Sequence, residues 1–413
     1  MNAGLECRFC ARPLEHTFVD LGMSPLCQTH VSREELNSME RFYPLHAYVC
    51  GQCFLVQLGE YVSPQEIFTE YAYFSSYADT WLRHVKDYTD LVTKRFGLRS
   101  SSKVVEVASN DGYLLQYFIE KGIPVLGVEP AANVARVAIE RGIPTVVEFL
   151  GSATGRRIAA EHGAADLVVG NNVLAHVPDL NDFVEGLKAL LKPSGGVITM
   201  EFPHLLTLVD LNQFDTIYHE HFSYFSFSTV ERVFAAHGLT LFDVDQIPTH
   251  GGSLRIYACR AGDEARSRTD AVAHLKTVED GWGVTRLDTY ARYARRVAAT
   301  KRGILKFLTA AKDAGKRIVG YGAPGKGNTL LNYCGIRTDF LDFTVDRSPY
   351  KQGKYTPGTH IPILHPDRIR EARPDFLFIL PWNLKEEIME QNAYIREWGG
   401  QFVVPIPELA VYP

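Results

Sequence analysis

The sequence lacks long apolar runs and blocks of like charge. No stretch approaches the roughly 20 apolar residues that a membrane-spanning helix needs, and the first residues show no basic segment followed by an apolar core. The 43 basic and 48 acidic residues are spread along the chain of 413 residues. This balance argues against a surface that follows a phosphate backbone or an anionic membrane. We therefore expect a cytoplasmic protein that binds neither nucleic acid nor membranes.

Cysteine is scarce, and its spacing is informative. Four of the seven cysteines form two C-x-x-C pairs, Cys7 with Cys10 and Cys50 with Cys53. Each pair can present two thiolates to one tetrahedral ion, and a closed four-thiolate shell is typical of structural zinc. The spacer of 39 residues predicts an inserted lobe between the pairs. A redox dithiol and unligated thiols are the alternatives.

The three remaining cysteines have no such spacing. Cys27 or His30 could compete as a metal ligand, although two complete pairs already fill four positions. Cys259 and Cys334 stand alone in apolar surroundings, and we expect both to be buried core thiols.

Residues 103–129 predict a strand, a loop, a helix and a second strand. The second strand ends at Glu129, 17 residues beyond Gly112, where a carboxylate can bind ribose hydroxyls at the carboxyl edge of a parallel sheet. The loop, ASNDG, lacks the G-x-G-x-x-G pattern and carries side chains where a pyrophosphate would lie. S-adenosylmethionine has an ammonium and a sulfonium but no phosphate. The loop therefore favours S-adenosylmethionine over a dinucleotide.

Ligands of such sheets lie at the carboxyl ends of the strands. We expect Glu106 and Asp111 near the methionine end of the cofactor, Glu129 on the ribose and Phe149 along the adenine. The full expected set is Glu106, Ser109, Asn110, Asp111, Gly112, Glu129, Phe149 and Asn171. A Rossmann-like sheet without cofactor is the alternative.

The next predicted strand, in DLVVGNNVLAHVPDL, ends at Asn171 and Asn172. Its end places Asn172 and His176 at the ligand crevice, where we expect Asn172 to contact the substrate. A purely structural His176 is the alternative, because a lone histidine is more often structural.

Residues 217–226, IYHEHFSYFS, concentrate titratable side chains. A zincin needs two histidines four apart on a helix, whereas His219 and His221 are two apart and no third ligand has a recognisable spacing. An alternating strand is the structural alternative. The third interpretation is acid–base chemistry, since a histidine titrates near neutrality and Glu220 and Tyr218 could orient it.

With these motifs the chain resembles the nucleotide-sugar C-methyltransferases of deoxysugar pathways, the family of the C-3′-methyltransferase of tetronitrose formation. The motifs that carry the resemblance span nearly the whole chain: CRFC, CGQC, EYAYFSSYADT, VEVASNDG, NNVLAHVPD, YHEHFSYFS, HGGSLR, GYGAPGKGN and YTPGTHIPI. In this family the histidine of the Tyr-x-Glu-His motif is taken as the base that removes the C-3 proton of the sugar. The resemblance assigns that role to His221, with Tyr218 and Glu220 beside it.

The resemblance implies further roles. It places Tyr73 and His176 facing the sugar, and it gives His219 no role. The expected α/β fold has an amino-terminal zinc-binding lobe, a central Rossmann-like class I methyltransferase domain and a carboxyl-terminal second Rossmann-like domain. We place these domains at 1–75, 76–260 and 261–413.

A second glycine loop lies in the carboxyl-terminal third. The segment GYGAPGK matches G-x-x-x-x-G-K, but Gly327 replaces the Ser or Thr that would hold magnesium, which argues against an ATPase. A glycine loop that opens a helix can still bind phosphates. With the family's support we expect Lys326 and Asn328 to contact the nucleoside diphosphate, with His250 and Arg255 as further contacts. A turn with only a packing role is the alternative.

The patterns favour an S-adenosylmethionine-dependent methyltransferase, and the resemblance implies a C-methyltransferase that acts at C-3 of a 4-keto-6-deoxy sugar carried on a nucleoside diphosphate. We expect a monomer with structural zinc. Methylation at C-5 or at an oxygen, and a non-catalytic zinc-stapled protein that binds sugar nucleotides, are the competing functions. An NAD oxidoreductase is disfavoured because the glycine fingerprint is missing.

Overall fold

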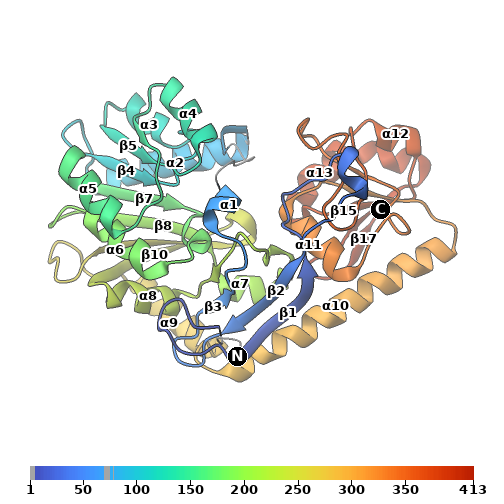
Figure 1. Ribbon diagram of the computed structural model, residues 1–413, viewed down its shortest axis with the longest axis horizontal. Coiled ribbons are helices and arrows are strands. Elements are labelled where there is room, and N and C mark those ends of the chain that lie inside the picture. The colour runs from blue at the N-terminus through green and yellow to red at the C-terminus, as the bar shows by residue number, and fades with distance from the viewer. Residues whose placement is uncertain (1–4, 69–74, 78) are drawn as a thin grey trace. The chain divides into compact units, whose positions relative to one another are not determined.

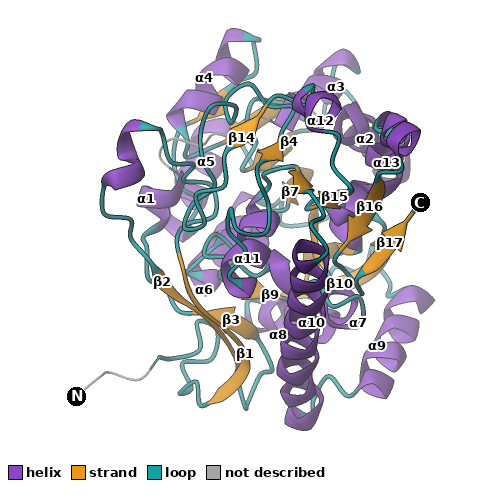
Figure 2. Cartoon of the chain, turned by 90° about the vertical axis from the view of Figure 1, so that its right-hand side faces the viewer, coloured by secondary structure: helices purple, strands orange, loops and turns teal. Residues whose placement is uncertain are grey.

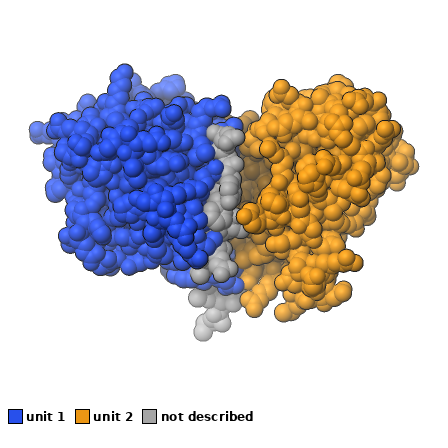
Figure 3. Space-filling view, turned by 90° about the horizontal axis from the view of Figure 1, so that it is seen from above, with its two compact units in different colours: residues 1–14, 50–204, 222–285 blue, residues 15–49, 205–221, 286–413 orange. Residues whose placement is uncertain are grey.

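The computed structural model describes residues 5–68, 75–77 and 79–413. The chain forms two compact units, and neither is a continuous segment of sequence (Figure 3). Unit 1 comprises Met1–Leu14, Cys50–His204 and Phe222–Thr285, and unit 2 comprises Glu15–Val49, Leu205–His221 and Arg286–Pro413.

Unit 1 is built around a seven-stranded sheet of order β10-β11-β8-β7-β4-β5-β6 (Figure 1). The strands are β4 (Val104–Val107), β5 (Val125–Val128), β6 (Thr145–Val146), β7 (Leu167–Asn171), β8 (Val197–Pro203), β10 (Leu239–Ile247) and β11 (Ser253–Arg260). The first five pair in parallel, whereas β11 is antiparallel to both β8 and β10. Every residue of β4, β5 and β7 is buried, as expected for parallel strands covered on both faces. The predicted Rossmann-like class I methyltransferase sheet is confirmed.

Helices and short pieces complete unit 1. They are α1 (Pro64–Phe68), η2 (Ser75–Tyr77), α2 (Asp79–Phe96), α3 (Leu115–Glu120), α4 (Ala132–Glu140), α5 (Ser152–His162), η3 (Leu174–His176), α6 (Leu180–Leu190), α8 (Phe227–Ala236), η5 (Thr249–Gly251) and α9 (Asp270–Trp282), with strands β3 (Val56–Leu58) and β9 (Ser223–Tyr224). The apolar face that the sequence predicts for α6 is buried. Glu279 of α9 is fully buried and accepts hydrogen bonds from Phe227 N and Ser228 N, which fixes the start of α8.

Unit 2 contains a six-stranded sheet of order β14-β13-β12-β15-β16-β17. Its strands are β12 (Ile318–Tyr321), β13 (Thr344–Val345), β14 (Ile363–Leu364), β15 (Phe376–Ile379), β16 (Gln401–Val404) and β17 (Ala410–Tyr412). All pair in parallel except β17, which is antiparallel to β16. The second Rossmann-like sheet that the sequence predicts is therefore present.

Unit 2 also contains a hairpin of β1 (His16–Ser24) and β2 (Tyr43–Val49). The long helix α10 (Leu287–Asp313) was predicted from Arg286 to Ala314. It packs against β1 (Figure 2), and Phe18 of β1 stacks on Tyr293 of α10. The other helical pieces are η1 (Glu34–Asn37), α7 (Leu205–Asp210), η4 (Phe214–Thr216), α11 (Gly325–Cys334), α12 (Arg368–Ala372), η6 (Trp382–Leu384), α13 (Lys385–Gln391) and η7 (Ala393–Trp398).

Among the described helices, none combines the length and the apolar character required to cross a membrane.

Candidate active site and zinc centre

The two C-x-x-C pairs come together in unit 1. The Sγ atoms of Cys7, Cys10, Cys50 and Cys53 all lie within 4.8 Å of one another. Both pairs have the same backbone turn. Ala11 N donates to Cys7 O at 2.8 Å, and Phe54 N donates to Cys50 O at 3.1 Å. The residue after each pair has a positive φ of 56° or 63°. The two C-x-x-C pairs therefore form equivalent turns that bring their four sulfur atoms together.

This cluster fits a tetrahedral ion. Two sulfur atoms bound at about 2.3 Å to one zinc ion lie about 3.8 Å apart. The Sγ separations are 3.5 Å for Cys7 and Cys53, 3.5 Å for Cys10 and Cys50, and 3.7 Å for Cys10 and Cys53. Gln57 Nε2 donates to Cys7 Sγ at 3.2 Å, which is the kind of outer hydrogen bond that orients a ligand.

The loop after β4 has the expected position at the carboxyl edge of the unit 1 sheet. Ala108, Asn110 and Gly112 all have positive φ values, so the chain turns sharply here. A Cβ on Gly112 would lie 2.1 Å from Ile143 Cδ1, so this position requires glycine for space as well as for conformation.

The polar side chains of this loop are held from two sides. Asn110 Oδ1 accepts a hydrogen bond from Ser75 N at 3.0 Å, and Asp111 Oδ2 accepts one from Ser76 Oγ. Arg141 Nη1 lies 3.5 Å from Asp111 Oδ2. The predicted cofactor loop is thus fixed by Ser75 and Ser76 at the end of the YAYFSS motif, and by Arg141, which no sequence motif indicated.

Two buried carboxyl groups stand at the ends of β4 and β5. Glu129 accepts hydrogen bonds from Asn110 N at 2.9 Å and Ala131 N at 2.8 Å, and burial raises its pKa. Glu106 is fully buried, and burial, together with the charges of Glu129 and Asp111, raises its pKa well above the usual range. The protonated form of Glu106 is therefore favoured.

Asn171 ends β7 and has an uncommon environment. Its side chain is more than nine-tenths buried, and neither amide atom has a hydrogen-bond partner within the described part of the chain. Buried amides are normally paired, so this side chain suits a polar ligand. Ser109 Oγ is likewise buried and unpaired among the described residues, whereas Phe149 is 40% exposed in the loop before α5.

The neighbouring predicted contacts lie at the same sheet edge. Asn172 Nδ2 lies 2.9 Å from His250 Nε2, and the His250 ring lies 5.2 Å from that of Trp81. His176 is partly buried and ends η3. Tyr73 lies outside the described residues, so its predicted role stays a prediction.

Glu201, near the end of β8, is the centre of a network that sequence reasoning missed. Its carboxylate lies 2.9 Å from His84 Nε2 and 2.6 Å from Arg255 Nη2. Arg255 also lies 3.6 Å from Asp245 and stacks over the Tyr88 ring. The Arg255 guanidinium is buried and already paired, and its predicted contact with substrate stays a prediction.

In unit 2, the segment before β9 forms a turn rather than the alternating strand considered above. Only Ser223–Tyr224 is a strand. His221 N donates to Tyr218 O at 2.9 Å, and the two rings lie 4.1 Å apart. His221 Nδ1 lies 3.0 Å from the carbonyl oxygen of Thr216. A carbonyl can only accept, so the proton is on Nδ1 and Nε2 is the basic nitrogen.

The other two polar side chains of this turn are buried. His219 Nε2 donates to Pro44 O at 3.2 Å, and burial lowers its pKa. Burial raises the pKa of Glu220 to about 7, and a hydrogen bond from Cys27 opposes this rise. Glu220 therefore titrates near neutrality, whereas burial disfavours the charged form of His219.

The glycine loop of unit 2 opens α11, as predicted. Lys326 Nζ donates to Asn383 Oδ1 at 2.9 Å and lies 4.7 Å from the Trp382 ring centre. Asp215 is fully buried, and its Oδ2 accepts from Trp382 Nε1 at 2.8 Å. Burial raises the pKa of Asp215 to about 7, which the Lys326 charge opposes. Asn328 is buried and its Oδ1 has no partner among the described residues.

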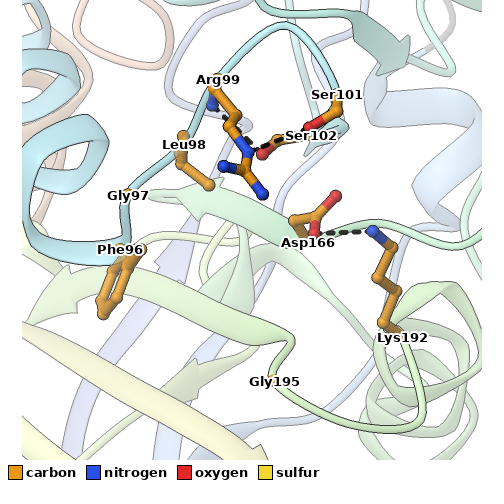
Figure 4. A pocket seen from close by; sticks show the side chains of 9 residues that line it. All are labelled: Phe96, Gly97, Leu98, Arg99, Ser101, Ser102, Asp166, Lys192 and Gly195. Carbon is orange, nitrogen blue, oxygen red and sulfur yellow. Dashed lines mark hydrogen bonds and ion pairs between the residues drawn. The ribbon is translucent and has the colours of Figure 1, made fainter.

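A separate cavity of about 280 Å³ lies at the opposite, amino edge of the unit 1 sheet (Figure 4). Arg99, Ser101, Asp166 and Lys192 contribute to its lining, and Asp166 is paired with Lys192 at 2.6 Å. Ligands of open α/β sheets bind at the carboxyl edge. We therefore assign this cavity no part in the chemistry.

Comparison with known families divides the chain into three matched segments. Residues 7–68 match a zinc binding domain, residues 81–244 a methyltransferase domain and residues 248–407 a C-methyltransferase C-terminal domain. The four clustered cysteines lie in the first segment and form a structural zinc site.

The chain is also similar to individual proteins and solved structures. The chain is 38% identical over 403 residues to the C-methyltransferase NovU of Streptomyces niveus, covering 98% of this chain and 96% of that protein. It is 26% identical to a ubiquinone biosynthesis O-methyltransferase of Acinetobacter baylyi, over 33% of this chain and 61% of that protein. Among solved structures, magnesium protoporphyrin IX methyltransferase of Synechocystis aligns with 44% of this chain and 83% of its own, at 14% identity and a TM-score of 0.35.

Proposed function

The chain belongs to the S-adenosylmethionine-dependent C-methyltransferases, and from this premise we propose that it methylates C-3 of a 4-keto-6-deoxy sugar carried on a nucleoside diphosphate. Under this proposal unit 1 holds the methyl donor, and unit 2 supplies the base and contacts to the diphosphate.

The hydrogen bond from His221 to Thr216 is the observation that carries the proposal. It fixes the tautomer in which Nε2 can accept a proton, and it leaves Nδ1–H to stabilise the imidazolium that forms. A hydrogen next to a keto group is acidic because its loss gives an enolate. His221 can therefore convert C-3 of such a sugar into a carbon nucleophile.

Glu220 and Tyr218 would assist this step. The Tyr218 ring packs 4.1 Å from the His221 ring and limits its rotation. The Glu220 carboxyl group titrates near pH 7. It can therefore accept a hydrogen bond from the polar substituents of the sugar or, when protonated, donate one to them. The developing oxyanion at C-4 needs such a donor.

The residues at the carboxyl edge of unit 1 suit the methyl donor. Glu129 would bind its ribose, and the buried Asn171 amide and the Asp111 carboxylate would bind polar groups of its methionine end. When bound, S-adenosylmethionine supplies an electrophilic methyl group on a sulfonium.

The glycine loop of unit 2 would bind the diphosphate. Lys326 lies in the first turn of α11, and Asn328 presents a buried amide in the same turn. The N-terminus of a helix attracts anions through its unpaired N–H groups.

Hydrogen exchange in heavy water, without methyl donor, tests the proposal. The wild-type enzyme should exchange the C-3 hydrogen of a thymidine-, GDP- or CDP-linked 4-keto-6-deoxy sugar, and His221→Asn should lose this exchange. His219→Asn is the matched control, because His219 lies in the same turn but is directed to Pro44. Equal exchange in the wild type and His221→Asn would remove His221 from the role.

Product analysis then fixes the position of the methyl group. Nuclear magnetic resonance of the product, made with a labelled methyl donor, distinguishes C-3 from C-5 and from oxygen. Methyl transfer without carbon deprotonation would contradict the proposed reaction and favour O-methylation. S-adenosylhomocysteine that fails to bind would instead favour a non-catalytic protein.

A further inference from the structure

The thiol of Cys27 meets the carboxyl group of Glu220 inside unit 2. Cys27 lies between β1 and η1 and is 3% exposed, and Glu220 is 6% exposed. Cys27 Sγ lies 3.6 Å from Glu220 Oε1. Burial, and then the charge of Glu220, raises the pKa of the Cys27 thiol well above its usual range. The thiol therefore stays protonated and donates a hydrogen bond to the carboxyl group.

The same residue also contacts the glycine loop. Asn328 Nδ2 donates to the carbonyl oxygen of Cys27 at 2.6 Å. A Cβ on Gly325 would lie 2.9 Å from Cys27 Sγ, so only glycine lets the loop approach the thiol this closely. Three residues further on, His30 Nε2 donates to Ala323 O at 3.4 Å. The segment around Cys27 is thus attached to the loop at several points.

We propose that Cys27 is a positioning residue for the reaction, whose thiol orients the Glu220 carboxyl group while its carbonyl fixes the glycine loop through Asn328. This inference rests on the proposed function, which gives Glu220 and the glycine loop their parts. Cys27 would then fix the distance between the group that faces the sugar and the groups that bind the diphosphate.

The surroundings distinguish this role from metal binding. The four zinc ligands belong to unit 1, whereas Cys27 belongs to unit 2. Tyr218, His219 and His221 lie on the same segment as Glu220, and His30 lies three residues after Cys27. Lys351 is a further charged group, and its charge acts on Cys27.

Kinetics of the whole chain test the proposal with four single variants and one double variant. Cys27→Ala removes the donor, and Cys27→Ser replaces it with a stronger one. Cys334→Ala is the matched control, because Cys334 is 4% exposed in the same unit and lies at the last turn of α11. Glu220→Gln removes the titrating carboxyl group.

We expect Cys27→Ala to lower kcat about tenfold, as for loss of a hydrogen bond to a charged group. The alkaline limb of kcat/KM should move to higher pH, because Glu220 donates in its protonated form and the thiol holds the pKa of Glu220 down. In Cys27→Ser it should move to lower pH. In the Glu220→Gln background, Cys27→Ala should cause no further shift.

Effects of Cys27→Ala that equal those of Cys334→Ala, or a shift that persists with Glu220→Gln, would overturn the proposal. If Cys27→Ala does not fold, an unchanged alkaline limb in Cys27→Ser would overturn it. Failure of the proposed function would appear in the wild type, which would exchange no C-3 hydrogen. In that case the infrared S–H band of Cys27 still decides: it should shift in Glu220→Gln, and an unmoved band would refute the hydrogen bond.

Discussion

The Nδ1–H of His221 is bound to the carbonyl oxygen of Thr216, five residues earlier, at 3.0 Å. Thr216 ends the short helix η4, and its hydroxyl donates to Gln213 O at 2.7 Å, so the accepting carbonyl belongs to an ordered turn. The imidazole is therefore oriented by a backbone carbonyl. Substitution of a single side chain cannot remove this acceptor.

Replacing His221 should separate chemistry from cofactor binding. His221→Asn should lower kcat by about 10²–10⁴, the usual contribution of a general base. The affinity for S-adenosylhomocysteine, measured by calorimetry, should be unchanged, because the predicted cofactor residues lie in unit 1. A parallel loss of cofactor affinity would indicate a structural role.

Asn171 should be required for cofactor affinity. Asn171→Ala should weaken binding of S-adenosylhomocysteine about tenfold, since a buried hydrogen-bonding partner is lost. Lys326→Met, in the other unit, should leave this affinity unchanged and weaken binding of the sugar nucleotide. Calorimetry with each ligand measures both, and an unaltered Asn171→Ala would exclude contact between Asn171 and the cofactor.

The pH dependence of stability should report Asp215. Burial raises its pKa to about 7 in the folded protein, against about 4 when unfolded. Between these values the folded state binds a proton that the unfolded state has released, so stability falls as pH rises through this range, by about 4 kcal/mol in total. Asp215→Asn should make the denaturation midpoint depend less on pH between pH 4 and 8. Asp313→Asn, at an exposed position, should leave the pH dependence of the midpoint unchanged.

The buried pair of Arg255 and Glu201 should be costly to break. Arg255→Met leaves the Glu201 carboxylate buried with only His84 beside it, and should destabilise the protein by about 3–5 kcal/mol. Arg157→Met, which breaks exposed pairs with Glu148 and Glu161, should barely change the thermal midpoint. Similar midpoints for the two variants would contradict the importance of the buried pair.

Removal of zinc should unfold part of unit 1. A four-thiolate site contributes folding free energy, so chelation at neutral pH should lower the thermal midpoint and release one zinc ion per chain. Cys10→Ser should have the same effect. Cys259→Ala, which alters a buried thiol on β11, should retain its zinc.

Much of this structure could be predicted from local sequence patterns. Buried strands such as VVEV, the apolar face of α6 and the C-x-x-C spacing each depend on residues close together in the chain. The turn at 217–222 was harder, because IYHEHFSYFS has the alternation of a strand. Its fold depends on contacts with distant residues, such as Pro44 and Thr329.

The residues that sequence reasoning missed lie far along the chain from the predicted residues that they contact. Glu201 is 54 positions from Arg255, and Cys27 is 193 positions from Glu220. Only the pairing of β11 with β8 aligns Arg255 with Glu201. A single sequence contains no local pattern that identifies such distant partners. Residues inside motifs could therefore be predicted, whereas the residues that contact them from elsewhere in the chain could not.

The alternation of the chain between its units limits how this enzyme can be divided. The backbone passes from one unit to the other at residues 14/15, 49/50, 204/205, 221/222 and 285/286. A gene fragment encoding residues 286–413 would therefore lack both the β1–β2 hairpin and the segment that ends with His221. Exchanging one half between relatives by simple recombination would mix parts of both units, so new sugar specificities are more readily obtained by replacing side chains than by joining gene segments.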